Sequence, residues 1–166
     1  MTKQSPGPSL KRSRAYLVAL ALLVVVAIPA AAAGRNLQDN ILGLRLGMSQ
    51  REVHRRLEKM ATLDREVRGR QEVWMLKSEP RFASVLVGFD ANYKVRYITA
   101  IAREGGNRMR YSDLAPIKDA QAESANGAYT RYTWEAKPGR KTAGYFLIAE
   151  GRDPEFLKSF SIKRHN

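Results

Sequence analysis

The sequence predicts an α+β domain, in which helices pack on an antiparallel β-meander, behind an N-terminal hydrophobic export helix. Three observations lead to this prediction. Residues 15–33 contain no charged side chain. Residues 49–60 place apolar side chains at helical spacing. Most of the later segments alternate or run apolar over strand lengths, and turn-forming residues separate them.

Length and composition limit what the chain can be. Its 166 residues have room for one ordinary domain, which we place at residues 34–166. The absence of cysteine excludes disulfides, thiolate metal sites, a cysteine nucleophile and a lipid-modified N-terminal cysteine. The formal net charge is +13, and +9 remains for the domain once the four cations of the acid-free N-terminal segment are removed. Such a basic domain attracts anionic lipid head groups or acidic glycans, whereas an exported location argues against nucleic acid as the partner.

The N-terminal segment has two parts. Residues 1–14 are basic and polar, and their proline, glycine and serine content favours disorder. Residues 15–33 follow as an uncharged run whose most apolar part, Tyr16–Ile28, has the length of a signal-peptide core.

Two outcomes are open for this run. Pro29 interrupts the helix, and the small residues before Gly34 form a cleavage site after Ala33, as in a signal peptide. The run is also just long enough to span a bilayer, so an uncleaved transmembrane anchor in the inner membrane is the alternative. In both cases the basic residues stay in the cytoplasm, and residues 34–166 lie on the periplasmic side.

The first helix of the domain is predicted over residues 49–60, after a linker and a short lead-in at residues 36–47. Ser49 and Glu52 have the spacing of a capping box, which satisfies backbone N–H groups at a helix start. The apolar face contains Val53, Leu57 and Met60. The opposite face is cationic and contains Arg51, Arg55, Arg56 and Lys59.

Three strands are predicted after this helix, at residues 72–78, 82–89 and 95–103. The turn formers from Asp90 to Tyr93 join the second and third strands into a hairpin.

The second half of the domain suggests the same plan. A helix is predicted over Ser112–Ala125, which the Asn126–Gly127 pair ends. Three more strands are predicted at residues 128–136, 143–150 and 156–163. A helix followed by three strands, found twice, suggests two tandem α-β-β-β units.

The residues around the first helix resemble a known family. Gly43–Val53 (GLRLGMSQREV), followed by Leu57, resembles the G-(M/Q)-S-x-x-E-V-x-x-x-L opening of the SmpA/OmlA-like outer-membrane-assembly lipoproteins. Related exported domains of the β-lactamase-inhibitor-protein-like fold share this opening. Val87–Val95 (VGFDANYKV) resembles the F-D-x-x-x-x-V hairpin of the same family.

This resemblance covers residues 41–103. It implies a small partner-binding module of the bacterial cell envelope, in which a helical N-terminus packs on an antiparallel sheet. The family is anchored through a lipidated N-terminal cysteine, which this chain lacks, so the implied role is limited to partner binding.

The sequence contains no recognisable catalytic, cofactor or metal motif. His54 lies on the predicted helix without a ligand set and is interpreted as a partly exposed surface residue, and the penultimate His165 as frayed. No serine lies in a G-x-S-x-G motif, and no glycine-rich phosphate loop is present. We therefore expect a non-enzymatic protein without a cofactor or metal. An unrecognised hydrolase, whose polar residues converge only on folding, is the alternative.

The candidate contact residues are cationic and aromatic. The four cations of the first helix are interpreted either as a solvated face or as a docking surface. For four aromatic residues, the choice is between core packing and docking: Tyr129, Tyr132, Trp134 and Tyr145. We expect an envelope accessory domain that binds a protein partner on the periplasmic side. A module that binds polyanions or an anionic membrane surface is the alternative.

Overall fold

The computed structural model describes residues 37–125, 129–139 and 143–165. The predicted basic region (1–14), the export segment (15–33) and the cleavage site at Ala33 and Gly34 lie outside these residues. The chain from Asn36 onward groups into one compact unit. Among the described residues, no helix is both long enough and apolar enough to cross a membrane.

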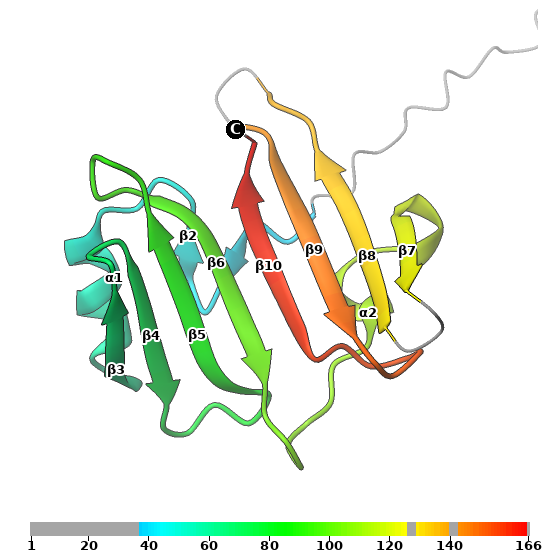
Figure 1. Ribbon diagram of the computed structural model, residues 1–166, viewed down its shortest axis with the longest axis horizontal. Helices are drawn as coiled ribbons and strands as arrows, with labels where there is room; N and C mark the ends of the chain where they lie inside the picture. Colours follow the sequence, from blue (N-terminus) through cyan, green and yellow to red (C-terminus); the bar gives the residue numbers. More distant parts are fainter. Residues whose placement is uncertain (1–36, 126–128, 140–142, 166) are drawn as a thin grey trace, which may run out of the picture. The chain divides into compact units, whose positions relative to one another are not determined.

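An antiparallel sheet of eight strands dominates this unit (Figure 1). The first four strands form one meander: β3 (Ala61–Val67), β4 (Gln71–Leu76), β5 (Phe82–Phe89) and β6 (Val95–Ala102). The last four form a second: β7 (Gln121–Ala125), β8 (Tyr129–Ala136), β9 (Tyr145–Gly151) and β10 (Ser159–Arg164). The spatial order is β3-β4-β5-β6-β10-β9-β8-β7, so β6 and β10 join the two meanders at a central seam.

The remaining elements are short, and they pack on one face of the sheet (Figure 1). A small hairpin consists of β1 (Asn40–Ile41) and β2 (Leu44–Arg45). Helix α1 (Gln50–Leu57) has two turns, α2 (Tyr111–Leu114) has one, and a 3-10 turn, η1 (Ile117–Asp119), follows. We call the side of the sheet that these elements touch the covered face.

The hydrophobic core lies between the covered face and these short elements. Side chains alternate across a strand, so the strand register identifies the residues that share a face. One row on the covered face crosses both meanders through Trp74, Val85, Ala100, Phe160, Ala149 and Tyr132. The next row contains Val87, Ile98, Ile162, Leu147 and Trp134. Val53 and Leu57 of α1 belong to the same core cluster.

The predicted fold class is wrong. Strands account for 51% of the structure and helices for 12%, so the protein is mostly β rather than an α+β fold with helices packed on a meander. The predicted tandem α-β-β-β units are replaced by two four-stranded meanders within one sheet.

The second predicted helix, Ser112–Ala125, accounts for much of this error. Ala115 is extended with φ −168°, and Pro116, which lacks a backbone N–H, follows it, so α2 ends at Leu114. Residues Gln121–Ala125 pair with β8 as an edge strand. Pairing with a neighbouring strand therefore outweighs the helical preference of this segment.

Candidate functional site

The second face of the sheet, which we call the open face, carries no helix or hairpin of the described residues (Figure 1). One row across it contains Val73, Leu86, Thr99, Ser161, Ile148 and Thr133. The next contains Met75, Ser84, Ile101, Ser159, Glu150 and Arg131. Leu86, Ile101 and Ile148 are half-buried although no helix or hairpin of the described residues packs on them, and Met75 is 45% exposed. The open face is therefore a mixed surface, on which apolar side chains of β5, β6 and β9 lie beside threonine and serine side chains of the central strands β6 and β10.

The predicted aromatic candidates do not form one surface. Tyr132 and Trp134 lie on the covered face, where the Trp134 indole is 1% exposed and donates a hydrogen bond to the Pro116 carbonyl at 2.9 Å. Tyr145 lies on the same side and donates its hydroxyl to the Leu37 carbonyl at 2.9 Å. Tyr129 is the first residue of β8 and lines a pocket at the end of the sheet. Three of the four residues therefore take part in packing, which is the first of the two interpretations that the sequence left open for them.

The predicted cationic residues do lie together on the exposed side of α1. Arg51, Arg55, Arg56 and Lys59 are all exposed. None of them forms an ion pair with a carboxylate of the described chain. The helix start beneath them is capped as predicted, because the Glu52 carboxylate accepts the Ser49 backbone N–H at 2.8 Å and the Ser49 hydroxyl at 2.6 Å. These hydrogen bonds lower the pKa of Glu52.

His54 has a partner that sequence reasoning missed. Its Nε2 lies 2.7 Å from Oε1 of Glu72, a carboxylate that is 2% exposed on the covered face beneath α1. The same Oε1 accepts a hydrogen bond from Gln50 at 2.6 Å, and Oε2 accepts one from the Trp74 indole at 2.9 Å. The sequence does contain a signal for this contact, because Glu72 is in phase with Trp74 and Leu76, which point inward.

The contacts of Glu72 fix α1 to β4. A shallow hollow beside His54 is lined by Gln50, Arg51, Arg55 and Glu58, none of which has a hydroxyl or thiol nucleophile. Across the part of the chain that is described, no three acidic, histidine or cysteine side chains are grouped to hold a metal ion. We therefore interpret the His54–Glu72 pair as a structural contact. His165 is also not frayed, since its ring stacks on Phe146 at 4.2 Å.

A pocket of about 620 Å³ lies at the end of the sheet, where the β6–α2 connection meets the β9–β10 connection. We call it the loop pocket. Its apolar lining includes Ala102, Tyr129, Phe156 and Leu157. Its charged lining includes Arg103, Glu104, Arg108, Arg152, Asp153 and Lys158.

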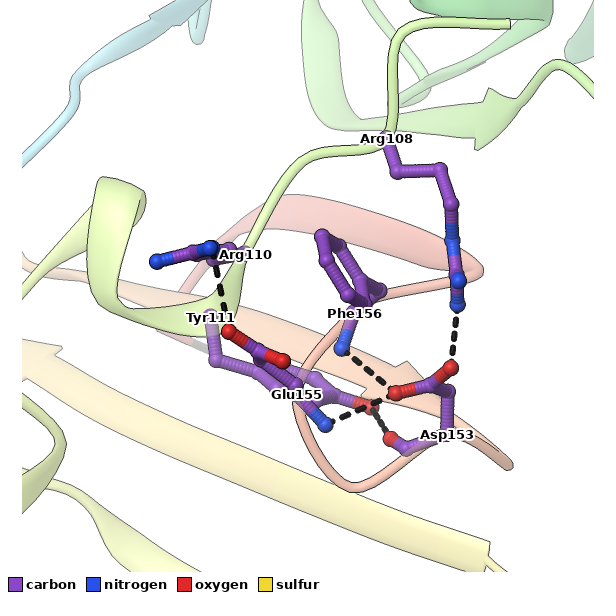
Figure 2. Close-up of polar contacts among 6 residues, drawn as sticks. All are labelled: Arg108, Arg110, Tyr111, Asp153, Glu155 and Phe156. Atoms are coloured by element: carbon purple, nitrogen blue, oxygen red, sulfur yellow. Dashed lines mark hydrogen bonds and ion pairs between the residues drawn. The ribbon is translucent and has the colours of Figure 1, made fainter.

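One wall of the loop pocket is held by contacts between the two connections (Figure 2). The Phe156 ring lies between two guanidinium groups, with that of Arg108 4.0 Å and that of Arg110 5.7 Å from the ring centroid. The Asp153 carboxylate accepts the backbone N–H groups of Glu155 at 2.9 Å and Phe156 at 3.0 Å, and it also pairs with Arg108. These hydrogen bonds hold the pKa of Asp153 below its ordinary value.

Two phenols complete this region. The Tyr111 hydroxyl donates to the Asp153 carbonyl at 3.2 Å, and burial raises the pKa of Tyr111 to about 12. Burial and a hydrogen bond to the Glu150 carboxylate raise the pKa of Tyr129 to about 12 as well. Both phenols therefore stay protonated at neutral pH and act as hydrogen-bond donors.

Comparisons with protein-family models, with curated proteins and with solved structures found no match to this chain.

Proposed function

We propose that this protein is a non-enzymatic accessory domain of the bacterial cell envelope, which binds a protein partner through the open face of its sheet. The domain would act on the periplasmic side, either released by cleavage or held at the inner membrane by residues 15–33. The uncharged N-terminal run and the family-like residues of Gly43–Val53 support this location and role.

The outward-pointing apolar side chains of the open face are the observation that carries the proposal. An antiparallel sheet with one solvated face normally alternates apolar side chains inward with polar ones outward. Here Leu86, Ile101 and Ile148 point away from the core, and they occupy strands of both meanders. Outward-pointing apolar side chains that are only half-buried are typical of an interaction site. Their polar neighbours are the hydrogen-bonded Thr99 and Ser161, which lie between Leu86 and Ile148. Arg131 and Glu150 form an ion pair at 3.3 Å farther along the same face.

The test is site-specific photo-crosslinking in intact envelopes. A photo-reactive phenylalanine analogue is placed at Ile101 or Ile148 on the open face, and at Arg55 on α1 as the control. We expect one reproducible crosslinked protein from both open-face positions and none from Arg55. We also expect Leu86→Asp to abolish this crosslink without unfolding the domain. Equal crosslinking from Arg55, or a crosslink that Leu86→Asp leaves unchanged, would contradict the proposal.

The exposed side of α1 favours a second candidate function, which is binding to anionic lipid head groups or acidic glycans. Its support is three arginines on α1 and Lys59 just after it, none of them ion-paired among the described residues, on a domain of charge +9. Salt screens such contacts, so binding to phosphatidylglycerol vesicles should weaken steeply between low and high ionic strength. The double variant Arg55→Glu/Arg56→Glu should abolish it. An affinity that is indifferent to ionic strength would rule this function out.

A further inference from the structure

We infer that the loop pocket binds a small anionic amphiphile, with an apolar body of medium chain length and a single carboxylate or phosphate head group. This site adjoins the open face, because Tyr129 of its lining is hydrogen-bonded to Glu150, but the inference does not depend on the proposed function. Three features of the pocket lead to this ligand class: its size and apolar floor, its uncompensated positive charge, and the rigidity of one wall.

The size and lining suit a small molecule. The volume of about 620 Å³ lies within the range of ligand sites in proteins, which are mostly apolar with a few placed polar groups. Ala102 and Leu157 supply aliphatic surface, and Phe156 and Tyr129 supply aromatic surface. Leu157 is 5% exposed and belongs to the hydrophobic core, so the pocket floor is continuous with the core.

The charge of the lining favours an anion. Four basic side chains line the pocket against two acidic ones. Two of the basic residues are neutralised, because Arg108 pairs with Asp153 and Lys158 pairs with Glu104 at 3.0 Å. Arg152 is exposed and has no ion pair among the described residues.

Arg103 adds to the net positive charge of the lining, but its guanidinium is engaged elsewhere. It donates to the backbone carbonyls of Leu76 at 2.9 Å, Glu79 at 3.1 Å and Phe82 at 3.1 Å, and none of these three residues lines the pocket. Arg152 is therefore the basic side chain of the lining that is left to pair with an anionic head group, through charge-assisted hydrogen bonds.

One wall of the pocket is already ordered. Phe156 is held between Arg108 and Arg110, and the turn beneath it is tied by the Asp153 carboxylate (Figure 2). A ligand therefore does not have to order this wall when it binds, which preserves affinity.

The test is photo-labelling of the full chain in the presence of phosphatidylcholine vesicles. Two probes are used, decanoic acid and decyl phosphate, each with a diazirine on the alkyl chain, and labelled peptides are mapped by mass spectrometry. We expect saturable labelling of residues 103–110 or 152–158. Excess decanoate or decyl phosphate should compete, whereas uncharged decanol should compete about tenfold less well, because it lacks the head-group charge. The better competitor identifies the head group.

Matched charge reversals locate the site. Arg152→Glu should reduce labelling about tenfold, whereas Arg70→Glu, the same change in the turn between β3 and β4, should leave it unchanged. Both residues are exposed, so both variants should keep the thermal midpoint of the parent protein. The inference is overturned if labelling is not saturable, if decanol competes as well as decanoate, or if the two variants behave alike.

Discussion

Glu72 is the least expected residue of the core. Burial of a carboxylate costs several kcal/mol unless hydrogen bonds and an opposite charge offset it. Here the two carboxylate oxygens of Glu72 have three partners. Gln50 and Trp74 donate hydrogen bonds to them, and the His54 ring lies within hydrogen-bond distance. Gln50 and His54 come from α1 and Trp74 from β4, so the carboxylate joins the helix to the sheet.

Removal of this carboxylate should therefore destabilise the protein. We expect Glu72→Ala to lower the free energy of unfolding by about 3–5 kcal/mol, because it leaves the Trp74 indole N–H buried and unpaired and removes the acceptor of the half-buried Gln50. Glu72→Gln, which keeps one acceptor oxygen, should cost less. Urea unfolding measures both. The exposed Glu58 is the control, and a loss with Glu58→Ala as large as that with Glu72→Ala would contradict this account.

The contact between Gly88 and Tyr97 shows what a missing Cβ permits on the open face. The Tyr97 ring lies directly over Gly88, so an added Cβ would come within 2.0 Å of it, and the Tyr97 hydroxyl donates to Gln71 at 2.7 Å. The ring therefore covers the glycine of the neighbouring strand.

We expect Gly88→Ala to destabilise the protein by about 1–3 kcal/mol, since the tyrosine must leave its position. A double-mutant cycle with Tyr97→Ala, measured by urea unfolding, tests this cause. In the Tyr97→Ala background the added methyl group should be tolerated. If Gly88→Ala costs the same in both backgrounds, the ring contact is not the reason.

At the scale of single residues, the sequence predicted the cap of α1 but not its buried anchor. Ser49 and Glu52 are three residues apart, so their pairing is a local property. His54 and Glu72 are eighteen residues apart, and their contact depends on how α1 lies on β4. Only the phase of Glu72 with Trp74 and Leu76 indicated that it points inward.

At the scale of elements, strands with apolar patterns were predictable and edge strands were not. β5 is buried along most of its length and was predicted with its bounds, Phe82–Phe89. β3 was missed because only Ala61 of its seven residues is buried and a bulge between Leu63 and Arg65 interrupts its alternation. A polar, bulged edge of this kind also discourages pairing with another chain.

The β9–β10 connection is an element whose order should depend on pH. Hydrogen bonds from the Glu155 backbone and from Arg108 lower the pKa of Asp153 below its ordinary value of 3.8. A carboxylate with a lowered pKa stabilises the folded state above the unfolded pKa, and this contribution is lost as the pH falls through the folded pKa. The connection should therefore stay ordered above pH 3.8 and loosen in stronger acid.

Amide NMR signals of Glu155 and Phe156, followed during an acid titration, measure this effect. We expect the variant Asp153→Asn to show weakened protection of both amides already at neutral pH. An unchanged pattern in Asp153→Asn would mean that the carboxylate does not order the connection.

At the scale of the whole molecule, the seam between the two meanders is the feature that local patterns did not reveal. Thr99 of β6 and Ser161 of β10 share a hydrogen bond of 2.8 Å across sixty-two residues of sequence. Hydrophobic periodicity identifies a strand but not its distant neighbour, so the sequence left open whether the halves share a sheet. The paired rows Ala100–Phe160 and Ile98–Ile162 show that the core crosses this seam.

A shared core implies that the two meanders unfold together. The chain has two tryptophans, Trp74 in the first meander and Trp134 in the second, so the variants Trp74→Phe and Trp134→Phe each leave one probe. In each variant, we expect tryptophan fluorescence and far-ultraviolet circular dichroism to give the same urea midpoint, as in a two-state transition. Phe160→Ala removes a fully buried ring at the seam and should lower the free energy of unfolding by about 3–5 kcal/mol. The urea midpoint should therefore fall by the same amount in the Trp74→Phe and Trp134→Phe variants. If Phe160→Ala shifted the Trp134 signal alone, the meanders would be separate folding units, and the seam would be a contact between them rather than part of one core.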